Sequence, residues 1–320
     1  MGEPHIVSID EIREAAARIR GVATRTPLLR WDDTTWLKPE SFQPIGAFKM
    51  RGAYNKIASL SEAERARGVV TYSSGNHAQA VARAARLLGA RAVICMPRDA
   101  PRIKIEGVER DGAEIQFTGM DSEERHALAL RLVEERGLVM VEPYDDPAII
   151  AGQGTCGLEI VEDLPEVTSV VVPVSGGGLS SGVATAVKAL APSARVIGVE
   201  PELAADAQES LQSGRLVTWT AEQTGRTMAD GLRTNSLGPL PFDHLRRFMD
   251  EIVTVSEEQM ADAIRQLARR ARLVVEPSGA ASMAAHLSGA AARTDADDAR
   301  VIVISGGNID PELFQRLLAG

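Results

Sequence analysis

Residues 171–187 read VVPVSGGGLSSGVATAV, an apolar run, three consecutive glycines and then a run of small residues. This order predicts a buried strand, a tight turn and a helix. Glycines let backbone N–H groups close around an anion, and the N-terminus of the following helix adds its dipole. We therefore interpret the turn as a phosphate-binding loop. Its residues are Ser175, Gly176, Gly177, Gly178 and Leu179.

Two other interpretations of this loop stay open. A tight turn that simply needs glycine is one of them. The other is a dinucleotide site, because Gly176 and Gly178 precede Gly182 in a spacing one residue longer than the usual fingerprint, and Glu200 ends the next predicted strand. No GK[ST] follows the glycines, so a P-loop nucleotide site is unsupported. We rank the phosphate loop first, the structural turn second and the dinucleotide site third.

The same alternation of strand and helix extends over nearly the whole chain of 320 residues. Strands are predicted at 69–73, 92–96, 113–118, 138–143, 169–174, 195–200, 251–256 and 300–305, and intervening helices include 76–88, 122–136, 180–190 and 257–271. Strands that are apolar on both faces and separated by helices are typical of parallel sheets. The fold class is therefore α/β, with parallel-rich twisted sheets flanked by helices. The length predicts two domains, or one large α/β domain with an insertion.

Composition limits the classes of binding partner and the cellular compartment that we expect for this protein. The net charge of −9 argues against a nucleic-acid partner, and no apolar run reaches membrane-spanning length. The N-terminus lacks the plan of a signal peptide. Cys95 and Cys156 have no Cys or His partner at zinc spacing, so we expect two buried structural thiols and a cytoplasmic protein.

A lone lysine in residues 41–55, SFQPIGAFKMRGAYN, needs an explanation. Lys49 stands among small and apolar residues and directly follows Phe48. Composition allows either a solvated surface charge or a nucleophile held in a pocket. A nucleophilic amine must be deprotonated, which an apolar surrounding favours.

Eight segments in a fixed order carry a resemblance to a known family: GAFKMRGA, SSGNHAQ, AGQGT, VSGGGL, GVEP, ADGLRT, EPSGA and SGGN. Together they resemble the fold-type II pyridoxal-phosphate enzymes, within them the serine racemases and serine/threonine dehydratases, including threo-3-hydroxyaspartate ammonia-lyases. The resemblance covers about residues 8–315. It implies a tryptophan synthase β-like fold, a homodimer, a large cofactor-binding domain (1–64 and 146–320) and a small mobile domain on the substrate side (65–145).

The resemblance also implies the roles of individual residues. Lys49 forms the Schiff base with pyridoxal 5′-phosphate, and the Ser175–Leu179 loop holds the cofactor phosphate. Asn76 matches the residue that bonds the 3′-hydroxyl of the ring, and Ser305 the residue that faces the pyridine nitrogen. A neutral serine there leaves a weaker electron sink than an aspartate, which suits β-elimination better than transamination. The remaining predicted cofactor-binding residues are Phe48, Gly231 and Glu276.

Substrate recognition is predicted at the start of the helix that follows SSGN. The loop of Ser73, Asn76 and His77 can clamp a carboxylate at that helix N-terminus. Arg125 and Thr234 are further candidates for the carboxylate, although Arg125 is equally typical of an exposed helix arginine. Ser74, on the cofactor face opposite Lys49, is predicted to move the second proton that racemisation requires. A plain helix-capping hydroxyl is the alternative for Ser74.

A divalent cation is expected after the strand at 195–200. Family members hold Mg²⁺ or Ca²⁺ with a glutamate, a backbone carbonyl four residues on and an aspartate two beyond. Glu200, the Ala204 carbonyl and Asp206 have this spacing, and such oxygen ligands suit hard cations. A solvated acidic turn is the alternative. A metal role for Glu200 weakens the dinucleotide interpretation.

The resemblance implies an ammonia-lyase that converts a β-hydroxy amino acid to a 2-oxo acid and ammonia. L-Threonine, L-serine and threo-3-hydroxyaspartate are the candidate substrates, with racemisation of serine as an accompanying activity. A β-replacement enzyme like the cysteine synthases is one alternative function. A small-molecule-binding homologue without turnover is the other.

Overall fold

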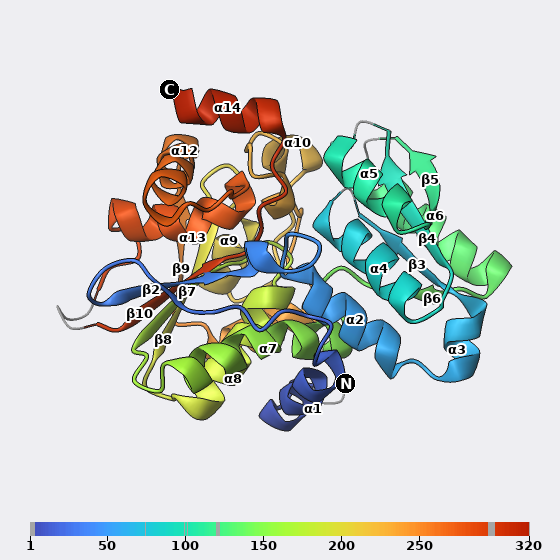
Figure 1. Cartoon of the computed structure of the whole chain (residues 1–320), viewed down its shortest axis with the longest axis horizontal. Helices are drawn as coiled ribbons and strands as arrows, with labels where there is room; N and C mark the ends of the chain where they lie inside the picture. Colours follow the sequence, from blue (N-terminus) through green and yellow to red (C-terminus); the bar gives the residue numbers. More distant parts are fainter. Residues whose placement is uncertain are drawn as a thin grey trace.

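The computed structural model describes residues 4–73, 75–98, 100, 102–119, 122–293 and 298–319. Within them the chain forms one six-stranded and one four-stranded sheet, seen side by side in Figure 1. The six-stranded sheet has the order β1-β2-β10-β7-β8-β9, and every pairing is parallel except β1 with β2. Its strands are β1 (Leu29–Arg30), β2 (Thr35–Pro39), β7 (Ser169–Pro173), β8 (Arg195–Pro201), β9 (Glu251–Val255) and β10 (Arg300–Ile304).

Helices cover both faces of this sheet (Figure 1). One face packs against α7 (Pro147–Asp163) and α8 (Gly178–Leu190), and the other against α12 (Glu257–Gln266) and α13 (Pro277–Ser288). Strand residues therefore alternate between two cores: Val170 and Val172 pack with the first pair, Val171 with the second. Burial on both faces explains why central strands such as β7 are apolar on both sides.

The four-stranded sheet is wholly parallel, with the order β5-β4-β3-β6. Its strands are β3 (Val69–Tyr72), β4 (Ala92–Pro97), β5 (Glu114–Thr118) and β6 (Val139–Met140). We call this sheet, with α4 (Asn76–Leu87), α5 (Arg102–Arg110) and α6 (Ser122–Arg136), the small unit, and the rest the large unit. Between the two sheets lies α2 (Lys49–Ser59), which packs against α4 and α7.

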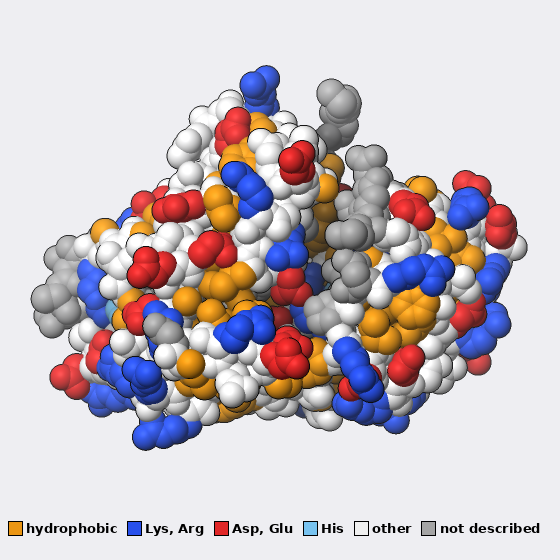
Figure 2. Space-filling model, turned by 90° about the horizontal axis from the view of Figure 1, so that it is seen from above, with side chains coloured by type: hydrophobic (Ala, Val, Ile, Leu, Met, Phe, Trp, Pro, Cys, Tyr) orange, Lys and Arg blue, Asp and Glu red, His pale blue; other side chains and the backbone are white. Residues whose placement is uncertain are grey.

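Shorter elements complete the described chain. They are α1 (Ile9–Ile19), η1 (Glu40–Phe42), α3 (Glu62–Arg67), α9 (Asp206–Ser213), α10 (Ala221–Thr224), η2 (Asp230–Leu232), α11 (Pro239–Phe248), the π-helical turn η3 (Leu267–Ala271) and α14 (Pro311–Ala319). No helix in the described residues is long and apolar enough to cross a membrane. The face in Figure 2 intersperses acidic and basic side chains and is hollowed between the two units.

The predicted α/β class is confirmed, and each of the eight predicted strands is present. Two strands, β1 and β2, were missed, because β2 carries a lysine and a proline that obscure its pattern. The strand predicted at 138–143 is shorter, since the carbonyl of Val141 accepts hydrogen bonds from the side chains of Thr71 and His77. Cys95 and Cys156 are buried free thiols as expected, and burial raises the pKa of Cys95 to about 11.

Candidate active site

Predicted site residues in the described part of the chain follow the carboxyl ends of four parallel strands, β3, β7, β8 and β10. The Lys49 segment is attached to the end of β10, because the Phe48 N–H donates to the Ser305 carbonyl (3.1 Å) and Ala47 bridges Gly306. Lys49 is then the first residue of α2. Segments more than 250 residues apart in the sequence therefore meet at one point.

Lys49 has the surroundings of a nucleophile. Its Nζ donates to the carbonyl of Pro143 at 2.6 Å and lies 5.2 Å from the centre of the Phe48 ring. Among the described residues, no carboxylate lies within ion-pair distance of Nζ. Burial without an anionic partner lowers its pKa from 10.5 to about 7. Near neutral pH a large fraction of the amine is therefore unprotonated and able to attack a carbonyl carbon.

Asn76 is held on both ends of its amide. Its Nδ2 donates to Glu276 Oε1 at 2.5 Å, and its Oδ1 accepts from Asn308 Nδ2 at 2.8 Å. Glu276 approaches the backbone so closely that a Cβ at Gly306 would lie 2.2 Å from Oε1. The predicted cofactor residues Asn76 and Glu276 are thus in contact across the two units. Asn308, which orients the amide, was not predicted although it belongs to the SGGN segment.

Ser305 is buried at the end of β10. Its hydroxyl makes one hydrogen bond among the described residues, a long one of 3.5 Å to the Ser278 carbonyl. The Ser278 hydroxyl accepts from the Gly231 N–H at 2.8 Å. Ser278 therefore links two predicted cofactor residues, and sequence reasoning did not select it. A weakly engaged hydroxyl in a buried position fits a partner such as a pyridine nitrogen.

The glycine loop has the backbone of an anion site. Ser175 and Gly177 are in the left-handed region, with φ of 58° and 91°. The helix α8 starts at Gly178 without a side-chain cap, so its first N–H groups have no partner from the helix itself. Ser175 Oγ is 3.0 Å from Thr234 Oγ1, which places Thr234 beside this loop. These features fit the phosphate of pyridoxal phosphate; a substrate role for Thr234 stays a prediction.

Contact with Tyr144 is a second reason why the loop carries glycine at positions 176 and 178. Tyr144 was not predicted from the sequence. A Cβ at Gly176 would lie 2.4 Å from the Tyr144 ring, and one at Gly178 would lie 3.0 Å from its Cα. Tyr144 directly follows Pro143, the hydrogen-bond partner of Lys49. Burial raises its pKa to about 12, so the hydroxyl is neutral. An aromatic residue just after the strand at 138–143 was the available signal.

The predicted substrate loop precedes α4. Ser73 Oγ accepts from the Gly75 N–H at 3.1 Å, and Gly75 leaves the helix N-terminus without a side-chain cap. Burial lowers the pKa of His77 to about 3, so its ring is neutral and Nε2 donates to the Val141 carbonyl at 3.1 Å. His77 thus makes a structural hydrogen bond to the backbone, and its role in binding substrate stays a prediction. Ser74 lies outside the described residues, and Arg125 is half-buried on α6.

The predicted metal ligands are all buried, with Glu200 and Asp206 each 1% exposed and Ala204 0%. Among the described residues, Glu200 Oε1 and both carboxylate oxygens of Asp206 have no hydrogen-bond partner. Burial, and then the neighbouring Asp206, raises the pKa of Glu200 well above its ordinary value. Two unpaired buried carboxylates are unfavourable by themselves. These oxygen donors fit a hard divalent cation. Because the three residues are buried, this turn is not a solvated acidic turn.

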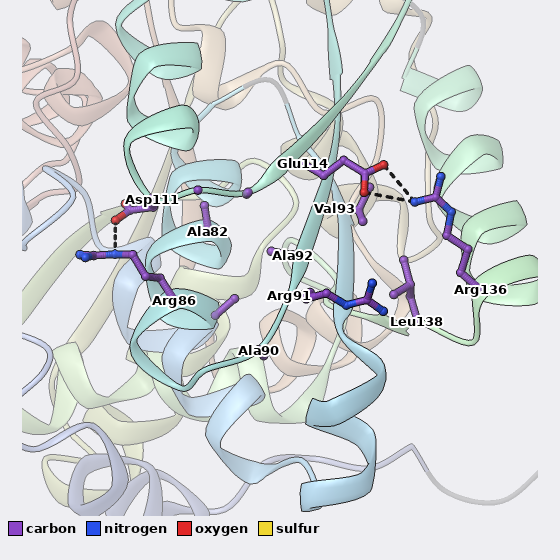
Figure 3. A pocket seen from close by; sticks show the side chains of 13 residues that line it. Ala82, Arg86, Ala90, Arg91, Ala92, Val93, Asp111, Glu114, Arg136 and Leu138 are labelled. Carbon is purple, nitrogen blue, oxygen red and sulfur yellow. Dashed lines mark hydrogen bonds and ion pairs between the residues drawn. The ribbon is translucent and has the colours of Figure 1, made fainter.

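A separate hollow lies at the opposite edge of the small unit. Figure 3 shows this cavity of about 330 Å³ at the amino ends of β4 and β5. Its acidic side chains are occupied by neighbouring arginines: Asp111 by Arg86 and Glu114 by Arg136. The carboxyl ends of the strands, where ligands bind in such sheets, are on the other side. The candidate active site therefore lies at the carboxyl-end edge.

Comparisons with known proteins agree with this geometry. The family model described as "pyridoxal-phosphate dependent enzyme" matches residues 19–306. The chain is 44% identical to the L-threonine ammonia-lyase of Thermotoga maritima, covering 98% of this chain and 78% of the relative. It is 38% identical to the L-threo-3-hydroxyaspartate ammonia-lyase of Saccharomyces cerevisiae, covering 97% and 96%. The structure of maize serine racemase superposes with a TM-score of 0.92 at 39% identity, covering 98% of each chain. The protein thus belongs to the pyridoxal-phosphate dependent enzyme family.

Proposed function

We propose that the protein is an ammonia-lyase that converts a β-hydroxy amino acid to a 2-oxo acid and ammonia. The carrying observation is Lys49, an amine with a pKa lowered to about 7. Its segment bridges Gly306, against which the Asn76–Glu276 pair lies. Bound pyridoxal phosphate supplies a ring that accepts the electron pair left on the substrate α-carbon. The names of relatives from the ammonia-lyase and racemase groups support this reaction class.

Each protein group has a task in this scheme. The uncapped N-terminus of α4, with Ser73, attracts the substrate carboxylate. Neutral Lys49 takes the α-proton at Nζ, and the proton can later return from the same atom. The neutral hydroxyl of Ser305 would face the pyridine nitrogen of the cofactor and would place no charge beside it. Ser74 is the proposed donor of a second proton, which would give racemisation in addition to elimination.

The reaction is tested by measuring oxo-acid release. L-Threonine, L-serine, threo-3-hydroxyaspartate and their stereoisomers are compared, and the remaining amino acid is analysed for chirality. Oxo-acid release from at least one of them supports the proposal. Release of none, together with a sulfide-dependent product from an activated serine, would favour β-replacement. A bound cofactor without any turnover would favour the non-catalytic alternative.

We also propose that Glu200, the Ala204 carbonyl and Asp206 bind Mg²⁺ or Ca²⁺. The support is their complete burial and the unpaired carboxylate oxygens. A ligand at a hundredfold excess over its Kd stabilises the folded state by about 2.7 kcal/mol. We expect Mg²⁺ or Ca²⁺ to raise the Tm of the wild type but not of Asp206→Asn. Equal shifts in both proteins would refute this site.

Three further proposals are a homodimer, a cytoplasmic location, and closure of residues 65–145 over the bound substrate. The first and the third rest on the family resemblance, and the second rests on the two free, buried cysteines. Sedimentation measures the first, and cell fractionation the second. Reduced hydrogen exchange in residues 65–145 on addition of a non-reacting substrate analogue would support the third.

A further inference from the structure

A buried lysine of the small unit reaches into the candidate site. Lys104 on α5 is 2% exposed, and its Nζ forms an ion pair with Asp230 of η2 and lies 3.6 Å from Glu276 Oε2. Both carboxylates belong to the large unit. The ammonium group also lies against the substrate loop, because a Cβ at Gly75 would be 3.2 Å from Nζ. Lys104 therefore links the small unit to two carboxylates of the large unit at the edge of the site.

Glu276 connects this lysine to the cofactor side. Its two carboxylate oxygens have different partners in the small unit. Oε1 accepts a hydrogen bond from Asn76, and Oε2 faces the Lys104 ammonium group. Asn308 then fixes the other end of the Asn76 amide and also donates to the carbonyl of Ile45, in the lysine segment. The result is a continuous relay from Lys104 through Glu276 and Asn76 to the segment that carries Lys49.

We propose that Lys104 is a positioning residue that keeps Glu276 ionised, so that Glu276 holds the Asn76 amide in its working orientation. An ionised carboxylate accepts only, which obliges Asn76 to present its N–H₂ end. A protonated Glu276 carries its own donor and no longer fixes which end of the amide faces it. Contact between α5 and the large unit, made by Lys104, thereby fixes the orientation of the Asn76 amide beside the cofactor ring. This inference rests on the function proposed above.

The charges around Glu276 support the relay. Burial raises the pKa of Glu276 to about 7, although Lys104 lowers it, and Asp230 raises it further. Burial alone would lower the pKa of Lys104, but Glu276 and Asp230 raise it above its ordinary value. Lys104 is thus a permanent cation between two carboxylates. Removing it leaves Glu276 beside Asp230 in a buried site, where the protonated form of Glu276 is favoured.

The test compares Lys104→Met with wild type over pH 6.5–9.5. At pH 7 we expect kcat/KM to fall by about tenfold or more, the size expected for one hydrogen bond to a charged acceptor. The deficit should shrink as pH rises and Glu276 ionises again without help. Lys104→Arg, which keeps the charge, should restore most of the activity. Lys188→Met removes a lysine that is 18% exposed and paired with Asp250, and it serves as the control outside the site.

Two arms do not depend on turnover of the loaded enzyme. The Kd of pyridoxal phosphate for cofactor-free protein should weaken in Lys104→Met relative to wild type, again with a ratio that shrinks toward high pH. In a Glu276→Gln background, Lys104→Met should add less than twofold to either deficit. If Lys104→Met fails to fold, Lys104→Gln replaces it, since its amide can still bond Asp230.

A deficit that is the same at every pH, or that persists in the Glu276→Gln background, would overturn the proposal and leave Lys104 with a packing role. An unchanged Lys104→Met would overturn it as well. If wild type releases no oxo acid from any hydroxy amino acid, the proposed function fails, while the cofactor-affinity arm still decides the role of Lys104.

Discussion

Lys49 and Arg51 lie two residues apart on α2, but their surroundings are opposite. Arg51 is 0% exposed and bonds both oxygens of Glu40 and of Glu159 at 2.7–2.8 Å. Burial would lower its pKa, but these carboxylates raise it well above the ordinary value. Among the described residues, Lys49 Nζ makes one hydrogen bond, to the Pro143 carbonyl, and its pKa falls to about 7. One cation is fixed as a charge, and the other is prepared to lose it.

The Arg51 cluster extends further into the large unit. Lys38 Nζ donates to Glu159 Oε2 and to the Thr26 carbonyl, both at 2.6 Å, and Thr26 Oγ1 donates to Glu40. Every charge in this cluster is paired, so it ties β2, α2 and α7 together beneath Lys49. The comparison teaches that a buried cation acts as a reactive group only when carboxylates are kept away from it. Predictions that remove each cation of α2 test this distinction.

The largest effect is expected for Lys49→Ala. Oxo-acid release should fall by at least about 10³-fold, because the variant loses both the nucleophile and the base. The fold should be retained, since Lys49 contributes a single hydrogen bond to a carbonyl. Turnover assays at saturating cofactor and near-UV circular dichroism measure the two. Substantial activity in a folded Lys49→Ala protein would remove the basis of the proposed function.

Next is Arg51→Met, which should act on stability first. It leaves Glu40 and Glu159 buried without their main partner, and breaking a buried ion pair typically costs about 3–5 kcal/mol. Urea unfolding of cofactor-free protein gives the free energy change. Adding Glu40→Gln to the variant should recover part of the loss. A change below about 1 kcal/mol in the single variant would contradict the structural role assigned to the cluster.

The pH dependence of stability distinguishes the two cations directly. Unfolded Lys49 binds its proton up to about pH 10.5, whereas folded Lys49 releases it near 7. The penalty of the buried charge is therefore complete below pH 7 and is relieved between 7 and 10.5. Cofactor-free wild type should gain on Lys49→Met with rising pH in this window, by at most about 1.4 kcal/mol per pH unit. A difference in unfolding free energy that stays flat over this window would show a Lys49 with its ordinary pKa.

Lys56 on the same helix should give the smallest effect. It pairs with Asp146 at 2.6 Å, with side chains 19% and 13% exposed. Lys56→Met should lower the unfolding free energy by about 0.5–1 kcal/mol, as for other partly exposed pairs, and leave turnover unchanged. A loss of activity comparable to that of Lys49→Ala would mean that position on α2, and not the local charge environment, decides reactivity.

Much of the fold was predictable from local pattern. The strand at 169–174 and the glycine turn after it are recognisable from their local residue pattern alone, and both are present where predicted. Strand β2 was missed because Lys38 breaks its apolar pattern. The distant Glu159 and the Thr26 carbonyl make that lysine acceptable in a buried strand. Burial of a charge depends on a partner that the local sequence does not display.

The candidate site follows the same division. The sequence by itself determined the family, and it singled out Lys49, the glycine loop and the carboxylates at 200 and 206 as candidate site residues, because each lies in a short segment of unusual residues. The tertiary structure alone placed Tyr144 against the glycines and Lys104 beside Glu276. It also lowers the pKa of Lys49 to about 7 while Arg51 keeps its charge. Chemical reactivity is set by distances between groups far apart in the chain, and those distances exist only after the two sheets have packed around α2.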